Sequence, residues 1–339
     1  MPTILSVTIP FFALIMVGYL AGQRRLLPEH AIPGLNAYVL FFALPCMLFR
    51  LGASMPFAQL LDPALVGIYA LCAVLLVGLT VAMTLRRHPG GPGVDLKNAA
   101  FGALVAAFPN SGFMGVPMLV ALLGQAAAGP VIGTLLVDLF LTSTLCLALA
   151  HAQRGTGAAE RGERGSAAGA GSVSAAIARS LRASATNPQP WAIALGALVA
   201  ATGAQLPAPV AQVVKMLADS ASPVALFTIG TVLWRAGQHA HHRTPVRDFL
   251  PVALIKLLAH PLLVGAAGLT ARAAGVNVPA FGLMVLGLTA ALPSASNVSL
   301  LAERYGADNG RVARIIMTST VLAFISFTLI AWGFSTGAG

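Results

Sequence analysis

Long apolar segments separated by short polar ones make up most of the chain. Each apolar segment is close to the ~20 residues that a helix needs to cross the hydrocarbon core of a bilayer. The pattern therefore predicts ten membrane-spanning helices, with boundaries placed to within about 2–4 residues. They cover residues 4–22, 31–51, 63–85, 97–123, 129–151, 190–202, 209–234, 249–271, 278–302 and 309–334.

Two of these segments contain residues that interrupt a helix. The fourth includes FPNSGFMGVP at 108–117, in which Pro109 and Pro117 each lack a backbone donor. The ninth includes ALPSASNVS at 291–299, around Pro293. Irregular backbone is tolerated at membrane depth only inside the protein or beside a water-filled cavity. Two interrupted segments in corresponding halves are a good sequence indication of a transporter's binding site.

The composition supports a membrane protein and argues against other classes. Of 339 residues, 57% are hydrophobic and 9% are charged, whereas a soluble domain carries about 25% charged residues. The net charge of +10 comes mostly from short loops, which argues against a nucleic-acid partner. The chain has no His-Glu-x-x-His and no phosphate-binding loop. Its single Gly-x-Ser-x-Gly, at 333–337, ends an apolar helical segment and does not follow a strand, so neither an enzyme nor an ATP site is predicted.

No metal or other cofactor site is predicted. Cys46, Cys72 and Cys146 lie in apolar segments without Cys-x-x-Cys spacing and are expected to pack as small apolar side chains. The histidines at 239, 241 and 242 fall in a polar loop, and no Cys or acidic residue stands at ligand spacing from them.

The positions of Lys and Arg predict the orientation. With the N-terminus outside, only Arg50 and Arg272 fall in outer loops, while sixteen basic residues fall in inner loops or helix ends. Membrane proteins keep basic loops in the cytoplasm, so both termini are predicted to lie outside. The inner residues are Arg24, Arg25, Arg86, Arg87, Lys97, Arg154, Arg161, Arg164, Arg179, Arg182, Arg235, Arg243, Arg247, Arg304, Arg311 and Arg314.

A polar segment divides the chain into two halves. Residues 153–187 are rich in Ala, Gly, Ser and Arg and are interpreted as a flexible cytoplasmic linker. The predicted repeats are 1–152 and 188–339, each with five helices. Pro45 and Pro223 occupy matching helices, as do the two interruptions. Because five is odd, the second repeat is expected to be inverted relative to the first.

With these residues in view, the chain resembles the auxin efflux carrier family over essentially its whole length. The motifs that carry the resemblance are 109–117 in the fourth segment and 292–297 with 301–306 in the ninth. The stretch 219–226 and Lys256 with Pro261 also resemble the family. The family includes bacterial carriers of malate- or malonate-like acids and plant auxin exporters, and it is related to the sodium-coupled bile acid symporters.

The resemblance implies ten helices in two inverted repeats, with broken helices 4 and 9 crossing. Helices 1, 2, 6 and 7 would form a scaffold, and helices 3–5 and 8–10 a transport domain that moves like an elevator. It also implies a multi-pass protein of the bacterial cytoplasmic membrane and a homodimer through helices 2 and 7. It does not extend to the choice of substrate, the direction of transport or the coupling ion.

The predicted substrate-binding residues lie at the two interruptions. Their polar groups would bind an anion while the positive ends of half-helices offset its charge. The alternative is that they only satisfy backbone groups freed by the prolines. These residues are Asn110, Asn297, Pro109, Ser111, Pro293, Ser294 and Ser296.

Three charged residues within helices are predicted to serve ion coupling. Asp138 lies mid-span, where an acid is costly and so is expected to be functional. Lys256 could attract the anion or simply neutralise Asp138. Asp219 lies one turn after Lys215, and an ordinary ion pair between them is the alternative. The coupling ion would be H⁺ or Na⁺.

The sequence therefore predicts a secondary transporter, most simply an exporter, of small organic anions such as dicarboxylates or auxin-like acids. Its partners would be that substrate and the lipid bilayer. A sodium-coupled symporter of bile acid type is the first alternative. A membrane sensor that binds the ligand without moving it is the alternative from another class.

Overall fold

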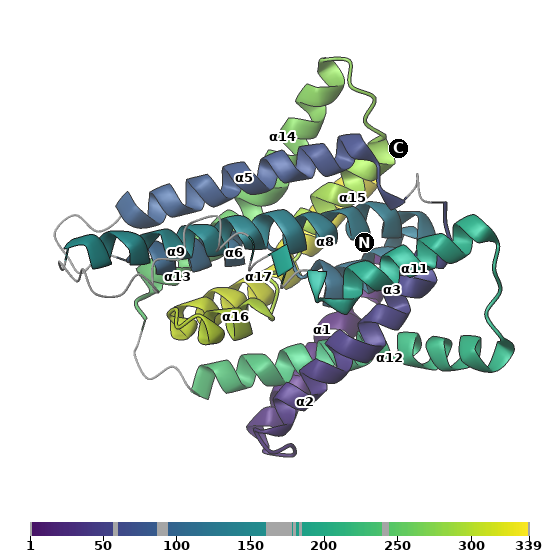
Figure 1. The fold of residues 1–339 in the computed structure, drawn as a ribbon, viewed down its shortest axis with the longest axis horizontal. Helices are drawn as coiled ribbons and strands as arrows, with labels where there is room; N and C mark the ends of the chain where they lie inside the picture. Colours follow the sequence, from purple (N-terminus) through teal and green to yellow (C-terminus); the bar gives the residue numbers. More distant parts are fainter. Residues whose placement is uncertain are drawn as a thin grey trace.

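The computed structural model describes residues 2–56, 60–86, 94–160, 178, 181–182, 185–238 and 244–337. These residues form helices joined by turns, and most of the helices run in roughly the same direction (Figure 1). The centre of the predicted linker, 161–177, and the histidines at 239, 241 and 242 lie outside the described residues.

The described residues of the first half form five helical segments, three of which are composite. Here η1, η2 and η4 are short π-helical stretches and η3 is a 3₁₀ turn. In order, the elements are α1 (Pro2–Gln23), α2 (Ala31–Tyr38), η1 (Val39–Ala43), α3 (Leu44–Ala53), α5 (Pro63–Arg86), α6 (Leu96–Ala107), η2 (Ser111–Gly115), α7 (Val116–Leu123), η3 (Gln125–Ala127), α8 (Ala128–Val137), η4 (Asp138–Thr142) and α9 (Ser143–Glu160).

In the second half, the ninth segment is in two pieces, as the fourth is in the first half. Another π-helical stretch, η5, interrupts the eighth segment. The elements are α11 (Pro188–Thr202), α12 (Ala208–Gln238), α13 (Val246–Leu254), η5 (Ile255–Ala259), α14 (His260–Ala273), α15 (Ala280–Ala290), α16 (Val298–Arg304) and α17 (Asn309–Gly337).

The architecture confirms an all-helical polytopic membrane protein. Among the described residues, seven helices are long and apolar enough to cross a membrane. Large apolar side chains such as Met16, Phe41 and Leu262 are exposed, as contact with lipid requires. The pieces α6, α7, α11 and α15 are shorter, so the count of ten spans stays a prediction. The seven are Ile4–Gln23, Ala31–Ala53, Pro63–Arg86, Gln125–His151, Ala208–Gln238, Val246–Ala273 and Asn309–Phe334.

Three of the π-helical stretches end two residues before a proline. These prolines are Pro45, Pro117 and Pro261. A proline cannot donate to the carbonyl four residues earlier. In each case the residue before the proline donates to a carbonyl five residues back, as Leu44 does to Val39. The wider turn lets the helix continue past the proline, whereas Pro223 lies inside α12 without such a stretch.

Glycines allow two pairs of helices to cross in close contact. A Cβ on Gly18 of α1 would lie 2.0 Å from the Phe227 carbonyl oxygen of α12. A Cβ on Gly196 of α11 would lie 2.3 Å from the Phe49 carbonyl oxygen of α3. Helices in membranes associate through such small residues because apolar lipid gives little driving force for association.

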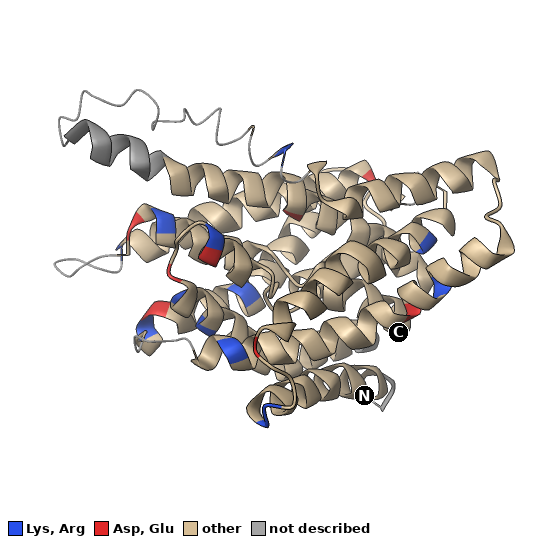
Figure 2. Ribbon diagram, turned by 60° about the horizontal axis from the view of Figure 1, so that its bottom comes forward, with Lys and Arg blue, Asp and Glu red and all other residues tan. Residues whose placement is uncertain are grey.

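Lys and Arg gather mainly at one end of the bundle (Figure 2). Arg311 of α17 joins two helix starts there, donating to the carbonyl of Asn98 in the first turn of α6 and to that of Asp248 in the first turn of α13. Arg235 near the end of α12 lies 3.8 Å from Glu303 of α16. We call the end of the bundle that contains Arg235 and Arg311 the basic end. Helix ends predicted to share one side of the membrane are therefore in contact.

Candidate functional site

The two interrupted segments meet inside the bundle. Pro109 and Ser294 form an isolated antiparallel bridge. The N–H of Asn110 donates to the carbonyl of Pro293 over 2.8 Å, and the N–H of Ala295 donates to the carbonyl of Phe108 over 3.0 Å. Because the prolines stop both helices, backbone groups are freed there, and these bonds pair them across the crossing. We call residues 108–111 and 293–297 the crossover.

The crossover contains every residue that the sequence predicted to bind substrate. Two of them, Ser111 and Ser294, are at most 1% exposed, and Asn110 is 5% exposed. The hydroxyl of Ser111 donates to the carbonyl of Pro109 over 3.4 Å, so one predicted ligand also serves the backbone. The full set is Pro109, Asn110, Ser111, Pro293, Ser294, Ser296 and Asn297.

Two side-chain oxygens at the crossover lack a hydrogen-bond partner within the described part of the chain. They are Oγ of Ser294 and Oδ1 of Asn297, and both are buried. Buried polar atoms are nearly always paired, and an unpaired one costs roughly 1–3 kcal/mol. Unpaired polar atoms of this kind are typical of an empty binding site, so Ser294 Oγ and Asn297 Oδ1 are candidate ligand-binding atoms.

The cavity at the crossover is small in this conformation. Its volume is about 20 Å³, which is room for about one water molecule and not for an organic acid. The crossover is therefore closed here, and a larger ligand needs the surrounding helices to move. The cavity is lined by Leu44, Phe108, Pro109, Asn110, Gly112, Phe113, Leu135, Leu139, Gln189, Ala295 and Asn297.

Lys256 stands at the end of the half-helix that leads into the crossover. Its Nζ donates to the carbonyl of Ala290, the last residue of α15, over 2.7 Å. It also lies 3.1 Å from Nδ1 of His260. The C-terminus of a helix carries partial negative charge, so a cation is stabilised there. Lys256 is fully buried and caps the broken ninth segment.

Asp138 is also fully buried, but its hydrogen bonds go to other partners. Its Oδ2 accepts from the hydroxyl of Tyr69 and its Oδ1 from that of Thr142, each over 3.0 Å. The ring of Tyr69 lies 5.6 Å from that of His260, which in turn contacts Lys256. The structure thus joins the two predicted coupling residues through a buried Tyr–His pair.

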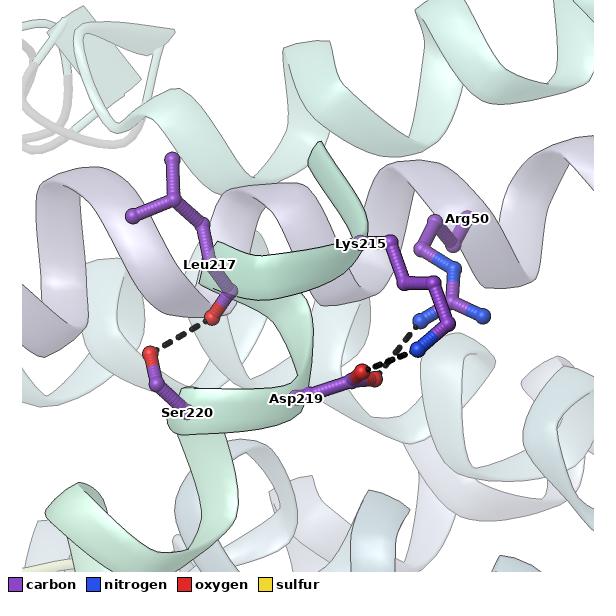
Figure 3. Close-up of polar contacts among 5 residues, drawn as sticks. All are labelled: Arg50, Lys215, Leu217, Asp219 and Ser220. Atoms are coloured by element: carbon purple, nitrogen blue, oxygen red, sulfur yellow. Dashed lines mark hydrogen bonds and ion pairs between the residues drawn. The ribbon is translucent and has the colours of Figure 1, made fainter. Parts of the chain in front are cut away.

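Asp219 lies away from the crossover, toward the end of the bundle opposite the basic end. Its Oδ1 accepts from Arg50 of α3 over 2.9 Å, and its Oδ2 accepts from Lys215 over 2.8 Å (Figure 3). All three side chains are about half exposed. The ion pair expected between Lys215 and Asp219 is present, and Arg50 of another helix adds a second cation.

Sequence reasoning missed three polar residues near these sites. Gln189, within Pro-Gln-Pro at the start of α11, is buried and lines the crossover cavity. Tyr69 lies in an apolar segment and bonds Asp138. The signal for it was its hydroxyl, because a tyrosine buried in an apolar segment usually needs a hydrogen-bond partner. Arg50 was counted only as an outer charge. Each of the three contacts groups far away in the sequence, which composition and spacing do not show.

A bundle with an apolar outer surface, two broken helices that meet inside it and a buried lysine at the end of one of them has the features of a polytopic membrane carrier. A profile of the family described as "Membrane transport protein" matches residues 3–331. The chain therefore belongs to this family, which is the auxin efflux carrier family. The family and its relatives are transporters and not enzymes.

Three relatives show how far the likeness extends. A protein named "Putative malonate transporter" from Rhizobium meliloti (strain 1021) is 26% identical over 340 residues, covering 100% of this chain and 98% of the relative. An "Uncharacterized transporter" from Methanothermobacter thermautotrophicus is 25% identical, covering 96% of each chain. "Auxin efflux carrier component 8" from Arabidopsis thaliana is 30% identical over 129 residues, which are 37% of this chain and 34% of the plant protein.

Proposed function

We propose that the chain is a secondary transporter of small organic anions, with the substrate bound at the crossover. The observation that carries the proposal is the meeting of two broken helices, which leaves the Ser294 hydroxyl buried, unpaired and able to donate to a carboxylate. Asn297 Oδ1 is also buried and unpaired, but it accepts hydrogen bonds and so suits a hydroxyl, a protonated carboxyl or a cation. Asn110 lines the same cavity as Asn297. Malonate is the acid in the name of the Rhizobium relative, and auxin is the acid in that of the plant relative.

Inverted repeats, which span 1–152 and 188–339 on either side of the 153–187 linker, account for the pairing of the helices. At the first close crossing, Gly18 of α1 contacts α12 and Gly230 of α12 contacts α1. At the second, Gly52 of α3 contacts α11 and Gly196 of α11 contacts α3. Gly18 and Gly196 are 178 positions apart, as are Gly52 and Gly230. Pro45 and Pro223 differ by the same shift. The common shift of 178 positions and the reciprocal contacts support the proposed inverted repeat.

An elevator motion is the proposed form of alternating access. Helices α1, α3, α11 and α12 pack on one another, as a scaffold would. The other group includes α5 against α6, α6 against α9, and α14 against α15. The groups meet where α1 contacts α7 and α17, and where α12 contacts η2. Sliding along this boundary would carry the crossover from one side of the membrane to the other.

Coupling to an ion gradient is proposed to involve Asp138 and Lys256. Both are fully buried in the transport group, and buried charges at membrane depth are retained for function. Asp138 would gain and lose a proton during transport. Lys256 would stay bound to the Ala290 carbonyl at the end of α15 while the charge of Asp138 changes. Asp219 would act at the surface with its two cations. We further propose that the protein exports its substrate across the bacterial cytoplasmic membrane. It would do so as a homodimer that associates through helices 2 and 7, with both termini outside.

Sodium coupling is a second candidate, favoured by the same unpaired oxygens. Hard cations prefer oxygen ligands from hydroxyl, amide and carbonyl groups. Ser294 Oγ and Asn297 Oδ1 would supply two of them. If Na⁺ binds there, the apparent affinity for the acid depends on Na⁺ concentration and not on pH.

The test is transport by the purified protein in liposomes on a solid-supported membrane. Malonate, malate, succinate, a bile acid and indole-acetate would be applied with and without Na⁺ and with a pH step, and isotope uptake would detect electroneutral exchange. Asn110→Ala and Asn297→Ala should abolish transport, while Asn277→Ala in the exposed loop before α15 serves as the matched control. Normal rates in both crossover variants, or binding of an acid without flux, would contradict the proposal.

A further inference from the structure

A second, larger cavity opens away from the crossover, toward the end opposite the basic end. Its volume is about 430 Å³, within the range of small-molecule sites. It lies between α3, α7 and α12 and has a mixed wall, with Met47, Val116 and Pro117 among the apolar residues. We call it the outer vestibule. Its polar side chains are Arg50, Ser54, Gln125, Asp219 and Ser222.

The charges at the outer vestibule favour an anion. Asp219 is bound by Arg50 through one oxygen and by Lys215 through the other. Two cations face one carboxylate, so the group keeps a net positive charge. Exposed ion pairs are weak and exchange readily with solvent, and all three side chains are exposed enough to do so. The Asp219 carboxylate thus occupies the position that a carboxylate from solution would take on Arg50.

The outer vestibule continues toward the crossover along one seam. On α3, Leu44 lines the crossover cavity, while Met47 and Leu51 line the vestibule. Residues three or four apart share a helix face, so these side chains form one row. On the opposite wall, Gly112 of η2 lines the crossover cavity and Val116 of α7 lines the vestibule. One helical turn on each wall separates the vestibule from the substrate site.

We propose that Arg50 is the outermost substrate-binding residue of the carrier, the last contact of an exported anion and the first of an anion that enters from the vestibule side, and that Asp219 is a built-in competitor for it. An incoming carboxylate displaces Asp219 from Arg50, whose planar guanidinium can bind it through two nitrogens. Asp219 remains bound to Lys215, which keeps its charge paired while the substrate moves along the seam. This inference rests on the proposed function and adds the class of ligand that the vestibule selects, small carboxylates of net negative charge.

The variants separate capture from competition. Because Arg50→Gln removes a charge-assisted hydrogen bond, it should raise KM at least about tenfold for malonate applied on the vestibule side of the membrane. The maximal rate should stay within about twofold, since capture precedes translocation. Arg50→Lys keeps the charge without the planar fork and should fall between the wild type and Arg50→Gln. Asp219→Asn should lower KM, because Arg50 loses its competitor.

Arg272→Gln is the matched control, because it removes the same charge from the last turn of α14 and lies outside the vestibule lining. Each variant is first checked for an unchanged melting temperature and elution profile. Equal KM values for Arg50→Gln and Arg272→Gln would overturn the inference, and an unchanged or raised KM in Asp219→Asn would overturn the competition. If Asn110→Ala still abolishes transport in either case, the proposed function stands. If the wild type moves no acid, both fail.

Discussion

Lys256 donates a hydrogen bond of 2.7 Å from its Nζ to the carbonyl of Ala290, the last residue of α15. This bond joins the eighth and ninth segments at the point where the ninth stops being helical. The carbonyls of a last helical turn lack partners within the helix, and in lipid they cannot turn to water. The buried cation therefore stabilises the broken helix as well as the charge balance of the site.

Lys256→Met should destabilise the protein more than Lys256→Gln does. Methionine leaves the Ala290 carbonyl buried and unpaired, which costs about 1–3 kcal/mol, whereas the glutamine amide can still donate. Melting temperatures of the purified variants in detergent would measure the difference. Lys215→Met removes an exposed cation and should change the melting temperature little. Equal stability of the two Lys256 variants would show that the bond to Ala290 is unimportant.

Asp138→Asn should separate transport from proton coupling. The amide can still accept from Tyr69 and donate to Thr142, so the fold should survive. Without a group that gains and loses a proton, uptake driven by a pH step should disappear, while exchange down the substrate gradient should continue. Counterflow and pH-driven uptake in liposomes measure the two activities.

Tyr69→Phe provides the comparison, since it removes one hydrogen bond to Asp138 but keeps the carboxylate. It should cost about 1 kcal/mol of stability and leave pH-driven uptake in place. Persistent pH-driven uptake in Asp138→Asn would rule out this residue as the proton carrier. Sodium dependence in the same assay would then favour the symporter candidate.

The sequence predicted those features that depend on local chemistry. Pro109 and Pro293 interrupt their helices wherever they are placed, and Lys215 and Asp219 are one turn apart on any helix. The boundaries of the long helices followed from apolar length alone. By contrast, the bond from Tyr69 to Asp138 joins residues 69 positions apart, and that from Arg50 to Asp219 joins residues 169 apart. Such contacts depend on how the helices pack.

The crossover shows the same division. Two interrupted segments could be recognised separately, but their mutual hydrogen bonds through Asn110 and Ala295 required the tertiary structure. Gln189 reaches the crossover because α11 packs against α3. The sequence offered Asp138 and Lys256 as a pair, whereas the structure gives them different hydrogen-bond partners and places Tyr69 and His260 between them.

Gly230→Ala should destabilise the contact between α1 and α12. A Cβ at this position would lie 2.0 Å from the Ile15 carbonyl oxygen, so the helices would have to separate. Crowding of this kind costs about 1–3 kcal/mol. Gly237→Ala on the same helix meets nothing within 4 Å and should be neutral or stabilising. Thermal unfolding of both variants tests the proposed scaffold, and equal melting temperatures would contradict it.

Alternating access predicts that the outer vestibule closes as a cavity at the basic end opens. In this structure the outer vestibule holds about 430 Å³, while the cavity beside Asn36, Ser299 and Glu303 holds about 150 Å³. Ser222 lines the first cavity and Ser299 the second. Cysteine at either position should therefore react with a membrane-impermeant thiol reagent from one side of the membrane only.

The two cysteine variants should respond to substrate as a pair. Saturating malonate on the vestibule side should slow labelling at Ser222→Cys, by occupancy and by moving the carrier toward the other state. Labelling at Ser299→Cys from the opposite side should rise as that state gains population. The unmodified protein sets the background, since Cys72 and Cys146 are buried and Cys46 is partly buried. If substrate slows labelling at both positions equally, substrate closes both cavities at once, and the binding site does not open to the opposite side of the membrane. If substrate changes neither rate, the two cavities do not alternate.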